Sequence, residues 1–191
     1  MAEINKNNEV NVSGGKGVAG GYFYVAPVGS TLPTDCKSEL DPAFKTLGFV
    51  SEDGVTFSSE SDSEELKDMN GDTIDTLSSS QTETFTVTLA EVKKGTQAAL
   101  YGAKNVTDEA GVLTVHVNGK STDKMACVFE LLLKNDRKWR RVVPIAKVTE
   151  VGDLTVAASE LVGREATFTA FKDKNGDFYI DYIESTETEM A

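Results

Sequence analysis

The chain has 191 residues, of which 39% are hydrophobic and 26% are charged, and its formal net charge is −12. This length suits one domain with a substantial core, because a chain of this size buries roughly 70% of the surface that its unfolded form exposes. The excess of acid argues against binding nucleic acid through a general basic surface, and against binding an anionic membrane. We expect no membrane span, because no apolar run approaches the roughly 20 residues that a span needs, and no signal peptide, because the N-terminus MAEINKNNEV has no apolar core.

Few residues are available for redox, metal or catalytic chemistry. Cys36 and Cys127 are too few for a disulfide framework, so free thiols in a reducing compartment are expected. Cys127 alternates in phase with Phe129 and Leu131, which predicts a buried position. His116 is the single histidine, and the sequence shows no partner that would make it a general base, so we expect it exposed on a strand. We predict no metal site, no cofactor and no enzymatic activity.

The negative charge is concentrated in one part of the chain. Residues 51–91 carry eleven acidic residues and one lysine, whereas residues 92–150 carry eleven basic and six acidic residues. Such a distribution means that one surface repels anions while another attracts them. Two interpretations remain open. Either an acidic loop lies beside an ordinary basic face, or acidic and basic faces of identical copies meet in an assembly.

The first fifty residues predict an arm, a strand and a loop. Residues 1–20 are rich in asparagine and glycine, which indicates a flexible N-terminal arm. Residues 21–28, GYFYVAPV, are aromatic and β-branched, as is typical of a core strand. Residues 29–47 contain Pro33 and Pro42 among scattered polar residues, and predict a loop.

The stretch 55–89 predicts a long β-hairpin. The turn signal is Asn70-Gly71, and on the return strand Phe85, Val87 and Leu89 alternate with threonines at the strand period. The residues in between have no apolar face. We therefore expect a hairpin with a half-buried base and a wholly polar tip, which must project into solvent or lie on a neighbouring molecule.

The rest of the chain predicts one helix and several strands. The helix is expected at 92–101, where apolar residues recur at helical spacing, with Gly102 just past its end. The further strands are expected at 112–117, at 125–133 paired with 138–148, and at 165–171 paired with 178–183. The predicted fold is mainly β: one β-sandwich or barrel domain over 21–184, with one flanking α-helix, a long projecting β-hairpin and a disordered tail at 185–191.

Two local motifs suggest binding functions. The run from Asp173 to Glu184 superficially resembles a calcium loop, but Phe178 stands where that loop needs glycine, so an Asn-Gly turn explains it more simply. A carbohydrate- or calcium-binding β-sandwich module remains the alternative function. The segment Lys138–Arg141 mixes cations with an aromatic residue, as binders of single strands do. The simpler interpretation is that Trp139 packs while the arginines meet carboxylates, either here or in another copy.

Several pieces of sequence, taken in order, resemble a known family. They are GYFYVAPVG and LPTD near the N-terminus, then FVSEDGVTFSSE, NGDTIDTL and ETFTVTLAE, and then a short helix that ends in ALYGAKNV. Their order and spacing over about residues 20–184 resemble the major tail (tail tube) protein of long-tailed bacteriophages.

The resemblance implies a structural subunit of the virion tail, assembled in the cytoplasm of the bacterial host. Six copies would close into a ring, and rings would stack into a tube with a negatively charged channel for the genome. The partners would be further copies, the tape-measure, tail-tip and tail-terminator proteins, and DNA that passes without specific binding; no membrane is involved. The N-terminal arm and residues 29–47 would become ordered on stacking.

The resemblance also implies where subunits meet and what lines the channel. The candidate lumen or ring-interface acids on the hairpin are Glu60, Asp62, Glu64, Asp72, Asp75 and Glu83. The basic charge of residues 92–150, and not the resemblance, gives the candidate basic residues at contacts between subunits: Lys93, Lys94, Arg137, Lys138, Arg140 and Arg141.

Overall fold

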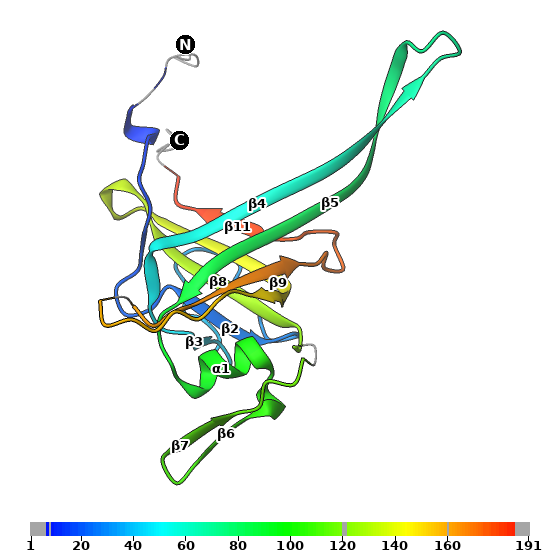
Figure 1. Cartoon of the computed structure of the whole chain (residues 1–191). Helices are drawn as coiled ribbons and strands as arrows, with labels where there is room; N and C mark the ends of the chain where they lie inside the picture. The colour runs from blue at the N-terminus through cyan, green and yellow to red at the C-terminus, as the bar shows by residue number, and fades with distance from the viewer. Residues whose placement is uncertain (1–6, 8, 120–121, 160, 186–191) are drawn as a thin grey trace.

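The structure is a computed structural model, and it describes residues 7, 9–119, 122–159 and 161–185. These residues form one large antiparallel sheet, one short α-helix and a separate two-stranded sheet, with a long hairpin that leaves the body of the domain (Figure 1). The predicted mainly β class, with one flanking helix and a long projecting hairpin, is confirmed.

The large sheet has the strand order β3-β2-β8-β9-β10-β5-β4, with β1 beside β8 and β11 beside β9. Its strands are β1 (Lys16–Gly17), β2 (Phe23–Pro27), β3 (Lys45–Thr46), β4 (Val50–Lys67), β5 (Thr73–Leu89), β8 (Met125–Leu132), β9 (Lys138–Val151), β10 (Arg164–Ala170) and β11 (Ile180–Ile183). The small sheet pairs β6 (Val106–Glu109) with β7 (Val112–Val115), and the helix is α1 (Lys94–Tyr101). Short 3-10 turns are η1 (Glu9–Asn11), η2 (Ala103–Asn105) and η3 (Lys134–Asp136).

The core forms because the large sheet curls until its two ends face each other. Phe23 of β2 and Phe129 of β8 stack with ring centroids 4.4 Å apart, and Phe85 of β5 and Phe168 of β10 stack at 4.6 Å. The two pairs meet edge to face, at 5.2 Å between Phe85 and Phe129. Such contacts stabilise a core beyond the burial of apolar area alone. Cys127 is fully buried beside these rings, as predicted, and burial raises the pKa of its thiol.

The outer face of β2, β8 and β9 is covered by the segment 29–47. Phe44 packs there against Val128 and Val142 in a second buried cluster. At its end the segment enters the main core through Leu47, which is 1% exposed. The resemblance implied that this segment becomes ordered on stacking, whereas the isolated chain already packs it on the sheet.

The helix α1 begins two residues later than the sequence predicted and ends where it predicted. Ala99 and Leu100 are buried against the core, and the Thr96 hydroxyl donates a hydrogen bond of 3.0 Å to the carbonyl of Leu47. Gly102 follows the helix with φ of +89°, a conformation that glycine adopts readily. Val92 lies before the helix and is exposed. Within the described residues, no helix is long and apolar enough to span a membrane.

The predicted pairing of 165–171 with 178–183 is wrong. β10 and β11 both pair with β9, one after the other, at Ala146–Val151 and at Trp139–Val142. After β10 the chain separates from β9, passes through the turn 173–177, and pairs with β9 again as β11. The turn 173–177 exists as predicted. However, β9 has fourteen residues and is long enough to pair with β10 and β11 one after the other, so these two strands do not pair with each other. The predicted pairing of 125–133 with 138–148 is confirmed.

The small sheet was only half predicted. β7 lies within the expected strand 112–117, but its partner β6 carries one buried apolar residue, Val106, and shows no strand periodicity. His116 is exposed, as expected, although it lies just past the end of β7. Its backbone N–H donates a hydrogen bond of 2.8 Å to the carbonyl of Asn105.

Candidate assembly surfaces

The root of the long hairpin is held by Arg141 of β9. Its guanidinium lies between two aromatic rings, 4.2 Å from the ring centroid of Phe57 on β4 and 4.1 Å from that of Tyr179. The same group donates two hydrogen bonds to the carboxylate of Asp181 on β11, at 2.8 and 2.6 Å. Cation–π contacts and a two-point pair with a carboxylate are the geometry that arginine favours. Arg141 therefore joins the hairpin root to the C-terminal strand.

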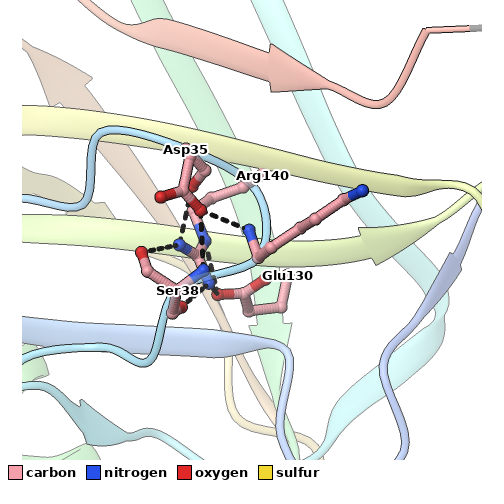
Figure 2. A network of polar contacts seen from close by, with 5 residues as sticks. Asp35, Ser38, Glu130 and Arg140 are labelled. Carbon is pink, nitrogen blue, oxygen red and sulfur yellow. Dashed lines mark hydrogen bonds and ion pairs between the residues drawn. The ribbon is translucent and has the colours of Figure 1, made fainter.

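The neighbouring residue, Arg140, points to the other face of the sheet and holds the segment 29–47 (Figure 2). Its guanidinium pairs with the carboxylate of Glu130 at 2.7 Å. It also donates hydrogen bonds to the carbonyls of Asp35, at 2.7 Å, and Ser38, at 2.8 Å. The backbone N–H groups of Ser38 and Lys37 donate to the Asp35 carboxylate and lower its pKa. The buried guanidinium of Arg140 thus donates hydrogen bonds to one carboxylate and to two backbone carbonyls of the segment 29–47.

The candidate basic residues therefore fall into two groups. Arg140 and Arg141 have partners within the chain, although the sequence suggested contacts between subunits. Lys93 pairs with Glu91 at 2.7 Å. The other three are Lys94 and Lys138, both exposed, and Arg137, which is half-buried. Among the described residues, the buried Nε of Arg137 has no hydrogen-bond partner.

The pairing register assigns each hairpin residue to a face. Phe57 stands opposite Phe85 and Ser59 opposite Glu83, and these side chains share the face that continues from the core. Because successive side chains of a strand point to opposite faces, Glu60, Asp62 and Glu64 form a row on the other face. The sequence alone could not have separated these faces on β5, because a bulge opposite Asp62 and Ser63 shifts the alternation there.

This register divides the six candidate acids. Asp75 stands opposite Leu66 and joins the row of Glu60, Asp62 and Glu64. Asp72 lies in the turn of the hairpin. Glu83 is only 5% exposed on the core face, where it accepts hydrogen bonds from Ser59 (2.6 Å) and Gln81 (2.7 Å). Four of the six acids thus share one exposed face, and Glu83 does not lie on it.

Toward the body of the domain, the same face is lined by hydroxyl groups. The hydroxyls of Thr86 and Thr167 are hydrogen-bonded at 3.1 Å, and those of Thr149 and Thr169 at 3.0 Å. These threonines lie on β5, β10 and β9, and both buried clusters lie elsewhere. We call this surface, from the threonines to the acids Glu60, Asp62, Glu64 and Asp75, the hydroxyl–acid face.

The hairpin also presents an unpaired strand edge. β4 is the last strand of the large sheet and is eighteen residues long, and within the described residues its only strand partner is β5. The opposite end of the sheet is β3, with two residues. A long free edge offers backbone donors and acceptors to another strand, and soluble proteins usually shield such edges.

The expectation of a wholly polar hairpin tip is wrong. Leu66, Met69, Ile74 and Leu77 all lie in or beside the turn, and all four are exposed. Leu77 stands opposite Glu64 and Leu66 opposite Asp75, so these two share the face of the acid row, whereas Ile74 lies at a second bulge near Lys67. Counting apolar residues between 66 and 77, and not their periodicity, would have found them.

Two turns of identical pattern, Asp-x-Asn-Gly-Asp, end the hairpin and follow β10. Oδ1 of Asp68 accepts hydrogen bonds from the backbone N–H groups of Asn70 (2.8 Å) and Asp72 (2.9 Å). Oδ1 of Asp173 does the same with Asn175 (2.8 Å) and Asp177 (3.0 Å). The other oxygen, Oδ2, accepts a hydrogen bond from the side-chain amide of Asn70 (3.2 Å) or Asn175 (3.1 Å), so both carboxylates stabilise their own turns. Among the described residues, no group of three or more His, Cys, Asp or Glu side chains could hold a metal ion.

These turns predict a dependence of stability on acid pH. Hydrogen bonds from backbone N–H groups, mainly that of Asp177, lower the pKa of Asp173 below its usual 3.8. The resulting stabilisation is complete above pH 3.8 and is lost as the pH falls through the lowered pKa. We therefore expect Asp173→Ala to lower the free energy of unfolding at pH 7, and to have a smaller effect at an acid pH below the lowered pKa, in urea titrations.

Asp177→Ala is the matched control, because the Asp177 side chain is exposed at the other end of the same turn. It should change stability little at either pH. A loss of stability in Asp173→Ala that is the same at both pH values would contradict the role of the ionised carboxylate.

Comparison with known families gives a match over nearly the whole chain. A family model described as phage tail tube protein matches residues 6–191. Among curated proteins, no sequence matches the chain.

Proposed function

Because the chain belongs to the phage tail tube protein family, whose members are structural components of the virion tail and not enzymes, we propose that its copies close into rings that stack around a negatively charged channel. Six subunits to a ring is the number that we expect. The observation that carries this proposal is the hydroxyl–acid face, a sheet surface that continues along a hairpin with no core of its own. Its side chains are polar except near the tip, where Leu77 stands opposite Glu64 and Leu66 opposite Asp75.

Ring closure is supported by the free edge of β4. A strand of eighteen residues with an open edge can pair with a strand of the next subunit, and a sheet that closes through all subunits has no edge left. Contacts of this head-to-tail kind close into a ring when the rotation between neighbours allows it. The hairpin then needs no core within its own chain, because its neighbours support it.

The channel lining is supported by the chemistry of the hydroxyl–acid face. Carboxylates repel the phosphates of DNA, whereas a basic lining would bind them with an affinity that grows with every phosphate neutralised. The threonine hydroxyls can hydrogen-bond to water at the channel wall, and they add no positive charge. We propose that DNA slides along this face without specific binding, and that the tape-measure, tail-tip and tail-terminator proteins meet the ends or the interior of the tube.

Electron microscopy of the purified full-length chain tests the proposal. We expect rings and tubes in negative stain, at high protein concentration or after addition of a tail-tip complex as initiator. Light scattering after size exclusion provides the control for the unassembled state. A chain that stays monomeric at all concentrations, with the initiator present, would contradict the proposed assembly.

A further inference from the structure

The chain contains three asparagines that are followed directly by glycine: Asn70-Gly71, Asn118-Gly119 and Asn175-Gly176. Such pairs are prone to spontaneous deamidation, because glycine has no side chain to hinder its own backbone nitrogen. All three asparagines are exposed, and the three glycines have similar positive φ, between +67° and +93°. Exposure and glycine conformation therefore do not distinguish the pairs, whereas the hydrogen bonds around them do.

The reaction needs two groups of each pair. The backbone nitrogen of the glycine loses its proton and attacks the side-chain carbonyl carbon of the asparagine. A C–N bond forms, and the amide nitrogen takes up a proton and leaves as ammonia, which gives a cyclic succinimide. Water then opens the ring to aspartate or isoaspartate, so water is the only co-reactant. A glycine N–H that donates a hydrogen bond must give up that bond before its nitrogen can attack.

The two Asp-x-Asn-Gly-Asp turns engage both groups. The N–H of Gly71 donates a hydrogen bond of 3.1 Å to the carbonyl of Asp68. The side-chain amide of Asn70 donates one of 3.2 Å to the carboxylate of the same aspartate. The corresponding two bonds in the turn 173–177 are 3.1 Å each. In both turns the attacking nitrogen and the amide that it would attack are held by the aspartate.

The third pair lies just after β7 and is held in another way. Nδ2 of Asn118 donates a hydrogen bond of 2.9 Å to Oδ1 of Asn105. Among the residues that the structure describes, the backbone N–H of Gly119 has no acceptor. The attacking nitrogen is therefore ready in this pair alone. We propose that Asn118-Gly119 is the site at which the folded chain deamidates, and that the conversion loosens the base of the small sheet.

The loosening follows from the contacts of Asn105. Its carbonyl accepts a hydrogen bond of 2.8 Å from the N–H of His116, and its Oδ1 accepts the one from Asn118, so it ties both ends of the small sheet together. Its own Nδ2 donates to the carbonyl of Tyr101, at 2.6 Å, and is not available to a new acceptor. A carboxylate at position 118 has no proton to donate, so two acceptors then face each other. This inference goes beyond the proposed function and does not depend on assembly.

Peptide mapping by mass spectrometry of the unassembled full-length chain tests the site. The folded chain is kept at 37 °C and mildly alkaline pH, and conversion of amide to acid is followed at each asparagine. Asn118 should convert about fivefold faster than Asn70 and Asn175, or more, the factor that one hydrogen bond of ordinary net strength supplies. In urea, where the turns are unfolded, the three rates should become similar. Conversion of Asn70 or Asn175 as fast as Asn118 in the folded chain would overturn the proposal.

Two variants test the physical reason. Asp68→Ala removes the carboxylate that orients the hairpin turn, so the rate at Asn70 should rise toward that of Asn118, which is the internal reference. Gly119→Asp should slow conversion at Asn118, because a side chain hinders the attacking nitrogen, and aspartate accepts positive φ better than most residues. An unchanged rate in either variant would overturn the assignment.

The variant Asn118→Asp reproduces the product and tests the loosening. Amide hydrogen exchange should accelerate in residues 105–117 and stay unchanged in β5 and β10. Asn175→Asp is the matched control, because it makes the same change of charge at an exposed Asn-Gly pair on another turn. It should leave exchange in residues 105–117 unchanged. Equal exchange of this segment in both variants would overturn the loosening of the small sheet.

Discussion

Replacing Arg140 with alanine is expected to lower the free energy of unfolding by about 3–5 kcal/mol, the usual effect of removing one partner from a buried ion pair. The Arg140 side chain is 5% exposed and that of its partner Glu130 is 15% exposed, so the variant leaves a carboxylate in a largely dry site. It also removes the donor to the carbonyls of Asp35 and Ser38. Chemical denaturation followed by far-UV circular dichroism measures the change.

Two further variants show whether the loss comes from the buried pair. The double change Arg140→Met with Glu130→Leu should recover part of the stability, because it leaves no unpaired charge. Lys138→Ala, two residues away and exposed, should change stability by less than about 0.5 kcal/mol. A small effect of Arg140→Ala, with the double variant no better, would show that Arg140 does not hold the segment 29–47.

A local readout follows from the same contact. In Arg140→Ala, amide hydrogen exchange should accelerate in residues 35–47 more than in β5 or β10, because the segment loses its attachment at Asp35 and Ser38 and keeps the apolar contacts of Phe44 and the polar contacts of Lys37 and Leu47. Uniform acceleration across the chain would instead indicate global destabilisation.

Reversing the charge of the acid row is expected to turn the channel into a DNA-binding surface. The variant Glu60→Lys, Asp62→Lys, Glu64→Lys changes three charges in every subunit, and each phosphate that it neutralises adds about 0.9 to the salt dependence of log K. Tubes of this variant should retain a short labelled duplex at least tenfold better than wild-type tubes at 50 mM salt. The difference should shrink strongly at 200 mM salt. Co-sedimentation of tubes with labelled DNA measures it.

The control carries the same change in charge away from the hydroxyl–acid face. Glu52, Asp108 and Glu109 are exposed on the hairpin root and on the small sheet. Their replacement by lysine should leave retention of DNA inside tubes near the wild-type value. Equal retention by both variants would show that net charge matters and that the hydroxyl–acid face is not the channel lining. Microscopy must show tubes in each sample, and Asp62→Lys alone serves if the triple variant does not assemble.

Features that depend on neighbours in sequence were predictable. The hairpin, the end of α1 at Gly102 and the burial of Cys127 all follow from apolar period or turn chemistry within a few residues. Features that depend on distant partners were not. The strand pairs of β10 and β11, the acids that Arg140 and Arg141 meet, and the Asp35 carbonyl that Arg140 meets bring together parts of the chain between 10 and 105 residues apart.

The sequence by itself determined that this protein is mainly β, that residues 51–91 carry a net charge of −10 out of the total of −12, and that it resembles tail tube proteins. The tertiary structure decided which of these acids lie together on one exposed surface. The pairing register and its bulges place Glu60, Asp62, Glu64 and Asp75 on one open face and bury Glu83 on the other. The physical reason is that a side chain's face depends on which residue stands opposite it, and one extra residue in a strand reverses every position beyond it.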